Sequence, residues 1–409
     1  MIQGYKGVRD FYPEDQRVQA YMFDAMRRAV ERFGYEAMNA SVLELSDLYL
    51  TKTSEEIVRE EAYTFEDRGG RSVTLRPEMT PTVARMVSAK SRDLGFPLRW
   101  YSIQNMFRYQ KPQRGRLREH WQLNADLFGV SDSAADREII LVAREVMREL
   151  GASEKDFSIR ISSRQVLEAL YDELAIPADA RQEATRLLDK KEKVDIRTPL
   201  EEKVGKDAAR ALLKKLETLA PPEALKQFID SLHEAGCANV TFDPNITRGF
   251  DYYTGMVFEV FDTHKDNKRS LFGGGRYDNL ISQFGGGDIP AVGFGMGDVT
   301  TRDFLETHNL LPALAPSTHL YVAPATDADE VAAEKAATLL RAYGVSVALG
   351  MKHRKFDDHK RHARKLAIPH FLVWGENEEA SGVGTVTSLE TKESFEGSLE
   401  DIAARVVSE

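Results

Sequence analysis

Hydrophobic and polar positions follow two different spacings along the chain. Between residues 15 and 33, apolar side chains recur every three or four positions, which predicts an amphipathic helix. Residues 120–130 instead alternate apolar and polar side chains, as a strand with one buried face does. Residues 35–45 and 98–110 also favour strands. Because a short turn-forming segment joins residues 98–110 to residues 120–130, we expect these two strands to form a long antiparallel hairpin.

The pattern changes between residues 166 and 235. This segment is dense in charge, has no strand pattern, and repeats leucine and alanine at helical spacing, which predicts an inserted helical module. A merely disordered charged segment is the alternative interpretation. Strand patterns return at residues 240–262 and continue into a glycine-rich region that ends near Asp303.

Residues 310–319 are rich in proline and small side chains, which predicts a linker. After them, strand-like and helix-like segments alternate, which predicts a small α/β domain with a largely parallel sheet. We therefore divide the chain into residues 1–165 and 236–310, which form one domain, an insertion of residues 166–235, and a C-terminal domain of residues 317–409.

Composition limits the classes of protein that the chain can represent. Its 409 residues, 42% of them hydrophobic, suffice for about two or three globular domains. No run of about eighteen apolar residues occurs, and the N-terminus has no apolar signal segment, so we expect no membrane association. The single cysteine, Cys237, excludes an internal disulfide and a metal site built from a cysteine cluster, which favours a cytoplasmic location.

A basic loop stands out in a chain whose formal net charge is -10. Four cations lie between residues 111 and 118, next to a strand on which Gln122, Asn124 and Asp126 share one face. A solvated strand face is the ordinary interpretation of such polar residues. Arg108, on the partner strand, favours a binding site instead, because guanidinium groups bind phosphate in a bidentate manner and amides or carboxylates hold ammonium or ring nitrogens.

Two further arginines lie beside glycine and tyrosine. Arg248 belongs to the string TRGFDYYTG, and Arg276 belongs to GGGRYDNL. The glycines either mark bulges and turns or allow the backbone to approach a ligand closely. Together with Arg108, these arginines indicate one anion-binding site.

These strings, with KGVRDFYPED near the N-terminus and TLRPEMTPTVAR after it, resemble those of the histidyl-tRNA synthetases, a class II aminoacyl-tRNA synthetase family. The resemblance runs from about residue 7 to residue 394. It implies an α+β fold, in which an antiparallel class II sheet is flanked by helices, interrupted by a helical insertion and followed by a C-terminal α/β anticodon-binding domain. Residues 1–165 and 236–310 would then form the catalytic domain.

The resemblance implies a histidine–tRNA ligase, which activates histidine with ATP to histidyl-adenylate and transfers it to the 3′ end of its tRNA. The substrates would be histidine, ATP with Mg²⁺, and tRNA for histidine, without a prosthetic group, in a cytoplasmic homodimer. Two alternatives remain. One is the synthetase-like regulatory subunit of ATP phosphoribosyltransferase, which typically lacks the anticodon-binding domain, and the other is a paralogue that does not charge tRNA.

The resemblance also implies roles for single residues. Arg108 and Arg248 would act on the α-phosphate of ATP, and Arg116 would reach the other phosphates. Histidine would be bound by Glu78, Thr80, Gln122, Asp126, Tyr253 and Tyr277, the tRNA acceptor end would contact Lys111, Gln113 and Arg118, and the anticodon side would contact Arg354, Lys355 and Arg361. A solvated amphipathic helix is the alternative interpretation of the basic segment 351–366.

The chain departs from the family pattern at three positions. Ser41 stands where the first motif usually has proline. Asp126 stands where many bacterial members have glutamate. The third motif usually carries an arginine that packs on adenine or the γ-phosphate, and Thr300 takes its place, while Arg302 would point away on a helix. We therefore expect Arg116 and a metal ion to hold the γ-phosphate, and adenine to lie between Phe107 or another aromatic side chain and the GFGMG backbone.

Overall fold

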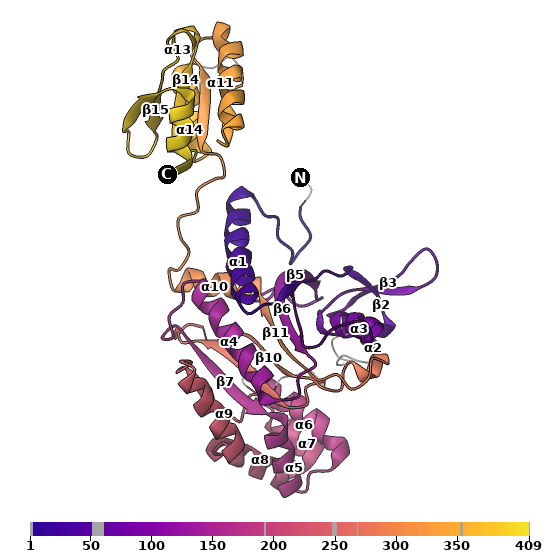
Figure 1. Cartoon of the computed structure of the whole chain (residues 1–409). Coiled ribbons are helices and arrows are strands. Elements are labelled where there is room, and N and C mark those ends of the chain that lie inside the picture. Colours follow the sequence, from indigo (N-terminus) through magenta and orange to yellow (C-terminus); the bar gives the residue numbers. More distant parts are fainter. Residues whose placement is uncertain are drawn as a thin grey trace. The chain divides into compact units, whose positions relative to one another are not determined.

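The computed structural model describes residues 3–50, 61–191, 194–247, 252–267, 269–351 and 355–408. The chain divides into two compact units (Figure 1). Unit one holds Gln19–Leu311 with the N-terminal residues up to Phe11, and unit two holds Pro312–Glu409 with Tyr12–Val18. The division before Pro312 falls within the proline-rich segment 310–319. Among the described residues, no helix is both long enough and apolar enough to cross a membrane.

An eight-stranded sheet forms the centre of unit one (Figure 1). Its interior strand pairs are antiparallel, whereas the outermost pair at each edge is parallel. The strands follow the order β1 (Glu36–Ala37), β5 (Leu98–Phe107), β6 (Glu119–Phe128), β11 (Ala291–Gly297), β10 (Ser270–Arg276), β9 (Met256–Asp262), β7 (Phe157–Ser163) and β8 (Val240–Phe242).

The predicted hairpin is confirmed by the pairing of β5 with β6, in which Phe107 lies opposite Glu119 and Gln104 opposite Gln122. The single strand predicted for residues 35–45 is wrong, because the segment divides between β1 and β2 (Leu43–Leu45), which belong to different sheets. The Arg76 side chain donates to the carbonyl oxygens of Ala40 and Ser41 between the two strands. These carbonyl groups are therefore satisfied by a side chain rather than by a neighbouring strand.

Helices and a second, smaller sheet surround this centre. The helix predicted from residue 15 extends from Pro13 to Arg32 and buries one stripe, including Met22, Met26 and Ala29. Helix α4 begins after Asp132, whose side chain accepts from the backbone N–H of Ala134. The remaining elements are α2 (Asp47–Leu50), α3 (Thr80–Lys90), α4 (Ser133–Glu149), η2 (Ser282–Phe284), α10 (Asp298–Thr307), and the three strands β2 (Leu43–Leu45), β4 (Ser72–Leu75) and β3 (Tyr63–Glu66).

The inserted segment is helical, as predicted, and helices α5 to α9 group together (Figure 1). It has a core of its own, in which Tyr171, Leu200 and Leu212 are completely buried. A disordered segment could not bury these side chains, so that alternative is excluded. The helices are α5 (Arg164–Glu173), α6 (Ala178–Lys190), α7 (Arg197–Val204), α8 (Lys206–Thr218) and α9 (Glu223–Glu234).

Unit two contains a five-stranded sheet in the order β13 (Val347–Leu349), β12 (Leu320–Pro324), β14 (His370–Trp374), β15 (Gly384–Ser388) and β16 (Ser394–Gly397). Strand β12 is parallel to both of its neighbours, but β14, β15 and β16 pair antiparallel. The sheet is therefore mixed, and the prediction of a largely parallel sheet is corrected. Residues 389–393, which join β15 to β16, are too few for the crossover that a parallel pair needs.

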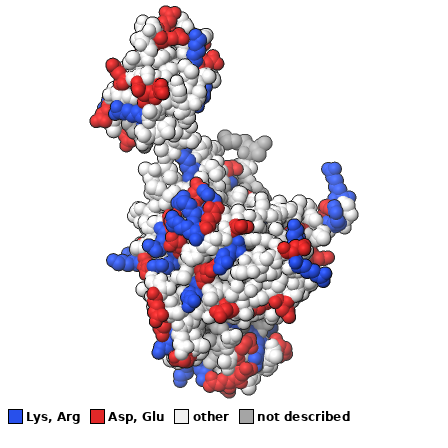
Figure 2. All heavy atoms as spheres, in the orientation of Figure 1, with Lys and Arg blue, Asp and Glu red and all other residues white. Residues whose placement is uncertain are grey.

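The helices of unit two are η3 (Asp327–Asp329), α11 (Glu330–Ala342), α12 (Phe356–Lys365), α13 (Glu376–Ser381) and α14 (Leu399–Ser408). Helices α11 and α14 bury small and branched side chains, among them Ala333, Leu340 and Ile402, against Leu320 and Leu372 of the sheet. Figure 2 shows acidic and basic side chains interspersed over the visible faces of both units. The basic loop is thus a local feature of a surface that carries both signs of charge.

Candidate active site

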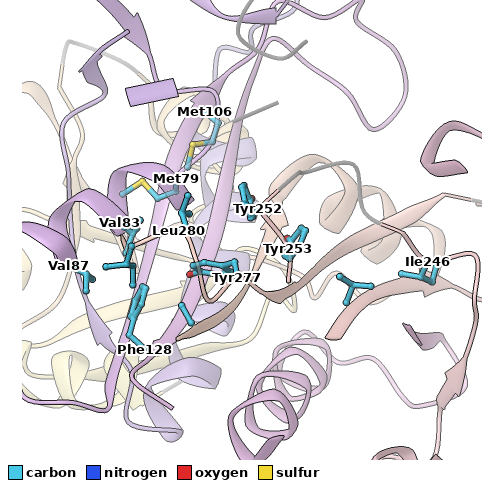
Figure 3. Packing of buried hydrophobic residues seen from close by; sticks show 14 of the residues in the cluster. Met79, Val83, Val87, Met106, Phe128, Ile246, Tyr252, Tyr253, Tyr277 and Leu280 are labelled. Atoms are coloured by element: carbon cyan, nitrogen blue, oxygen red, sulfur yellow. The ribbon is translucent and has the colours of Figure 1, made fainter. Parts of the chain in front are cut away.

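A cavity of about 120 Å³ opens on one face of the large sheet. Strands β6, β10 and β11 form its floor, and the chain before α3 and before β9 forms its walls. Its lining is mostly polar. An apolar cluster that includes Met79, Met106 and Phe128 packs around three tyrosines of the site, Tyr252, Tyr253 and Tyr277 (Figure 3). The lining residues are Glu78, Thr80, Arg108, Gln122, Asn124, Asp126, Tyr252, Tyr253, Gly273, Tyr277, Gly293, Phe294 and Gly295.

Glycines in β11 make room for the polar side chains of β6. Gly293 lies opposite Asp126, and Gly295 lies opposite Asn124. A Cβ atom at Gly293 would lie 2.0 Å from Asp126 Oδ1, and one at Gly295 would lie 2.5 Å from the Gln122 amide nitrogen. Any larger residue would therefore displace the polar side chains that cover the sheet floor. The glycine string is required by neighbouring side chains, not by a turn.

Asp126 and Tyr277 form the deepest polar contact of the pocket. The Tyr277 hydroxyl donates to Asp126 Oδ1 at 2.5 Å, and both side chains are buried. Burial raises the pKa of Asp126 to about 7, although the hydrogen bond from Tyr277 acts in the opposite direction. Among the described residues, none donates to Asp126 Oδ2. This second carboxylate oxygen is available to a ligand that carries an N–H group.

Glu78 provides a second carboxylate to the same cavity. It lies between β4 and α3, and its Oε2 accepts a hydrogen bond of 3.0 Å from the Tyr252 hydroxyl. Tyr252 packs against Tyr253 and Tyr277, with ring centroids 4.9 and 5.8 Å away. Sequence reasoning selected Tyr253 and passed over Tyr252. The alternation of side chains between the two faces of a strand does not distinguish these adjacent residues. Both precede the first residue of β9, and both line the cavity.

Arg108 closes the polar end of the cavity. Its Nε donates to the Pro77 carbonyl at 2.8 Å, which fixes the guanidinium beside Glu78. Within the described part of the chain, no oxygen accepts from its two terminal nitrogens. At the same end, Gln122 donates to Asn124 Oδ1 at 2.8 Å. A fixed guanidinium whose two terminal nitrogens have no acceptor among the described residues is suited to an anion such as a phosphate group.

His120 lies on the same strand face as Gln122, two residues earlier. Burial, followed by the positive charge of Arg108, lowers the pKa of His120 to about 3, so the imidazole is neutral. Its Cδ2 lies 3.9 Å from the place that a Cβ of Gly297 would occupy. His120 is not among the residues that line the cavity, but the alternation of residues 120 to 126 places it on the same strand face.

Contacts near the N-terminus hold α10 beside the hairpin. Asp298, the first residue of α10, pairs with Arg9 at 2.6 Å and accepts from the backbone N–H of Trp121 at 2.9 Å. Five residues further along α10, Asp303 accepts from Arg114 of the basic loop, with Nε–Oδ distances of 2.9 and 3.1 Å. Helix α10 is therefore held to the N-terminal segment and to β6 before Thr300, and to the basic loop after it.

The chain matches the family model described as histidyl-tRNA synthetase over residues 7–297. It belongs to this family. A second model, described as an anticodon binding domain, matches residues 319–409. The polar cavity described above therefore lies within the region matched by the synthetase model, and the anticodon-binding match covers most of unit two.

Individual relatives agree with the family match over the full length. A histidine–tRNA ligase of Leptospira biflexa serovar Patoc is 40% identical over 429 residues, which cover 100% of this chain and 98% of that protein. A histidine–tRNA ligase of Haloarcula marismortui is 35% identical over 415 residues, which cover 96% of this chain and 95% of that protein. The crystal structure of histidyl-tRNA synthetase from Nostoc sp. PCC 7120 has a TM-score of 0.82 at 21% identity, covers 100% of this chain and 99% of that chain, and supports the fold.

The structure brings together most of the residues that the resemblance assigned to histidine and ATP. The exception within the described chain is Arg116, which lies on the loop beside the cavity, where burial and then the charges of Arg269 and Arg108 lower its pKa. Arg248 lies outside the described residues, so its role stays a prediction. The cavity is lined by Glu78, Thr80, Arg108, Gln122, Asp126, Tyr253 and Tyr277.

Arg276 corrects the expectation that three arginines share one site. It is buried on the side of β10 that faces α4, where it pairs with Asp136 at 2.9 Å and with Asp278 at 3.1 Å. The adjacent Gly275 lies on the other side, beside Tyr253. Because neighbouring residues on a strand point to opposite faces, Arg276 stabilises the packing of α4 and does not line the cavity.

Phe107 also lies away from the cavity. It pairs with Glu119, three positions after the Gln104–Gln122 pair, so the strand register places it on the opposite face of the hairpin from Gln122. The expectation that Phe107 stacks on adenine is therefore wrong.

Arg302, the nearest arginine after Thr300, pairs with Glu306 along α10 at 2.8 Å.

The residues assigned to the tRNA acceptor end lie along the basic loop. Lys111 and Gln113 are exposed, and the backbone groups of Gln113 and Arg116 pair with each other. Arg118 lies 4.0 Å above the ring centroid of Tyr109 and donates to the Tyr5 hydroxyl at 3.1 Å. These contacts hold Arg118 beside the N-terminal segment.

In unit two, α12 buries His359 and Ala363 and exposes its cations. Arg361 pairs with Asp358 at 2.9 Å, and these two residues line a shallow surface hollow with His362 and Lys365. Lys355 precedes the helix and is exposed. Arg354, the third residue assigned to the anticodon side, lies outside the described residues.

Proposed function

We propose that the protein ligates histidine to its tRNA in two steps within the cavity above Asp126. The carboxylate of histidine attacks the α-phosphorus of ATP, the bond from that phosphorus to the bridging oxygen breaks, and pyrophosphate leaves. A ribose hydroxyl at the 3′ end of tRNA then attacks the carbonyl carbon, and AMP leaves. The observation that carries this proposal is a single cavity in which a fixed Arg108 lies near two buried carboxylates, Glu78 and Asp126.

The deep end of the cavity is suited to the imidazole of histidine. Asp126 Oδ2 accepts from a ring N–H, while Tyr277 fixes the other carboxylate oxygen. An amino acid whose side chain lacks such a donor would leave Asp126 buried without that hydrogen bond, which is energetically unfavourable. Glu78 and Thr80, together with Gln122, hold the α-ammonium group at the other end, because a carboxylate and two neutral oxygens satisfy its three donors.

The nucleotide occupies the side of the cavity that carries Arg108. The terminal nitrogens of Arg108 bind the α-phosphate and stabilise the charge that develops there. Arg248 binds the same phosphate and the histidine carboxylate. Mg²⁺ enters with ATP as part of the substrate and neutralises the remaining phosphate charge with Arg116. The neutral, flat imidazole of His120 is the stacking partner of adenine, in place of Phe107.

No protein nucleophile or general base is needed for activation. The carboxylate of histidine is already ionised at neutral pH, and the two reacting groups are both anionic. The arginines therefore accelerate the reaction by holding two anions together and by stabilising the phosphoryl oxygens.

The remaining parts of the proposal concern tRNA and assembly. Lys111 and Gln113 of the loop, with Arg118, contact the acceptor end, and Lys355 and Arg361 of unit two contact the anticodon side with Arg354. Residues 1–165 and 236–310 act as the catalytic domain, residues 166–235 as an insertion, and residues 317–409 as the anticodon-binding domain. We propose a cytoplasmic homodimer.

Histidine-dependent exchange of labelled pyrophosphate into ATP tests the first step, and charging of tRNA tests the second. We expect both activities. Exchange without charging would support a paralogue that does not charge tRNA, and absence of both would support a regulatory role. The anticodon-binding region at residues 319–409 disfavours the regulatory subunit, which typically lacks it.

A further inference from the structure

Position 300 lacks the cation that the third motif usually supplies, and its side chain has a different structural role. The Thr300 hydroxyl lies 2.9 Å from the carbonyl oxygen of Leu271, to which it donates. Its Cγ2 lies 3.5 Å from the place that a Cβ of Gly115 would occupy. Thr300 therefore fills the space between the basic loop and the start of β10.

Arg269 lies immediately before β10, two residues from the carbonyl that Thr300 contacts. Its Nη1 donates to the carbonyl oxygen of Arg114 at 3.3 Å, which places the guanidinium on the loop that carries Arg116. The side chain is exposed, and no carboxylate of the described residues lies within ion-pair distance of it. Arg114 itself is committed to Asp303, so it is not available to a ligand.

Three guanidinium groups that form no ion pair with another described residue therefore lie on or next to the basic loop, those of Arg108, Arg116 and Arg269. No described residue accepts from the terminal nitrogens of Arg108. Burial, followed by the charges of Arg269 and Arg108, lowers the pKa of Arg116, although Glu61 and Asp189 act in the opposite direction. Neither Arg108 nor Arg116 forms an ion pair within the described residues. Like charges held together are unfavourable, and a multiply charged anion relieves this repulsion.

We infer that Arg269 binds the pyrophosphate portion of ATP together with Arg116, and that it supplies the positive charge that position 300 lacks. This inference rests on the proposed function. When the bond from the α-phosphorus to the bridging oxygen breaks, that oxygen leaves with the pyrophosphate and carries the additional negative charge. A guanidinium beside Arg116 stabilises this charge.

The alternative is that Arg269 only positions the loop through the carbonyl of Arg114. Arg269→Gln distinguishes the two roles, because glutamine retains an N–H donor but removes the charge. We expect Arg269→Ala and Arg269→Gln to weaken calorimetric binding of inorganic pyrophosphate at least tenfold and to lower the exchange rate at subsaturating ATP by a similar factor. Wild-type behaviour of Arg269→Gln in both assays would overturn the inference.

Lys265→Ala is the matched control, since Lys265 is an exposed cation on the same connection between β9 and β10. It should bind pyrophosphate within twofold of the wild type, and an equal loss in this variant would overturn the assignment to Arg269. Moving the positive charge from position 269 to position 300 provides the second test. Thr300→Arg should raise pyrophosphate affinity in the Arg269→Ala background at least threefold, and no gain there would contradict a shared phosphate position.

The two proposals fail in different ways. If the wild type shows no histidine-dependent exchange, the proposed function is wrong, while the pyrophosphate-binding comparison still tests Arg269. If the wild type exchanges pyrophosphate normally and Arg269→Ala binds pyrophosphate within twofold of it, only the inference about Arg269 is wrong. Thermal unfolding of each variant confirms that the comparison is made between folded proteins.

Discussion

Tyr277, which directly follows β10, donates a hydrogen bond of 2.5 Å to Asp126 of β6 although β11 lies between these two strands, and both residues are buried beside the cavity. The contact fixes one carboxylate oxygen and leaves the other toward the cavity. In the strand register Gly293 lies opposite Asp126, and its missing side chain leaves room for the carboxylate.

Asp126→Asn should raise the KM for histidine at least tenfold and change the KM for ATP by less than threefold. The amide can no longer accept from the imidazole as a carboxylate does, while Arg108 is unaffected. Pyrophosphate exchange measured against each substrate separates the two effects. An equal rise in both KM values would mean that the strand itself had been damaged. Arg302→Ala, on the outer side of α10, is the control.

Asp126 should also make the protein less stable as pH rises. Its pKa is raised from the usual 3.8 to about 7 in the folded state, so the folded protein binds more protons than the unfolded chain between these values. Stability contributed by this group therefore falls as pH rises from about 4 to about 7. The Asp126→Asn variant lacks this pH-dependent loss. The difference in free energy of unfolding, variant minus wild type, should therefore be about 1–3 kcal/mol larger at pH 8 than at pH 5. Urea unfolding at both pH values measures this, and a constant difference would contradict the assignment.

Gly293→Ala should abolish histidine binding, because the new Cβ would lie 2.0 Å from Asp126 Oδ1. We also expect a loss of about 1–3 kcal/mol of stability, typical of overpacking. Gly95→Ala is the matched control, since a Cβ there meets no atom within 4 Å. Calorimetric titration with histidine and thermal unfolding provide the two readouts. Normal binding by Gly293→Ala would exclude the proposed position of the Asp126 side chain.

Arg248→Ala should lower the rate of pyrophosphate exchange at least tenfold, and Arg108→Ala should do the same. Each removes one of two guanidinium groups proposed at the α-phosphate, so neither loss is compensated by the other. Exchange kinetics at saturating histidine measure the effect. Unchanged exchange in Arg248→Ala would remove that residue from the proposed mechanism, since its role is inferred from the string that contains it.

Arg276→Ala should destabilise the protein without a specific effect on substrate binding. It would leave Asp136 buried without its partner, and breaking such a pair costs about 3–5 kcal/mol. The folded fraction should bind histidine and pyrophosphate as the wild type does. Denaturant unfolding and calorimetry test this together. A variant of normal stability with weakened pyrophosphate binding would instead return Arg276 to the site.

Local patterns in the sequence predict the hairpin and the polar face of its second strand. Strand alternation is a property of the backbone, so Gln122, Asn124 and Asp126 lie on one side whatever the rest of the chain does. Helical spacing likewise predicts the insertion, because leucine and alanine recur at the period of one helix face. The family strings identify Arg108, Glu78 and Tyr277 as site residues before any contact is known.

Only the tertiary structure decides which strands lie next to β6. Because β11 lies beside β6, the glycines of β11 leave room for the polar side chains of β6. In the same arrangement Tyr277 contacts Asp126, and Arg276 faces α4. The same packing places Arg269 on the basic loop although the two are far apart in sequence. Such contacts depend on burial of apolar surface summed over distant segments, and a local pattern contains no information on which distant partner completes that burial.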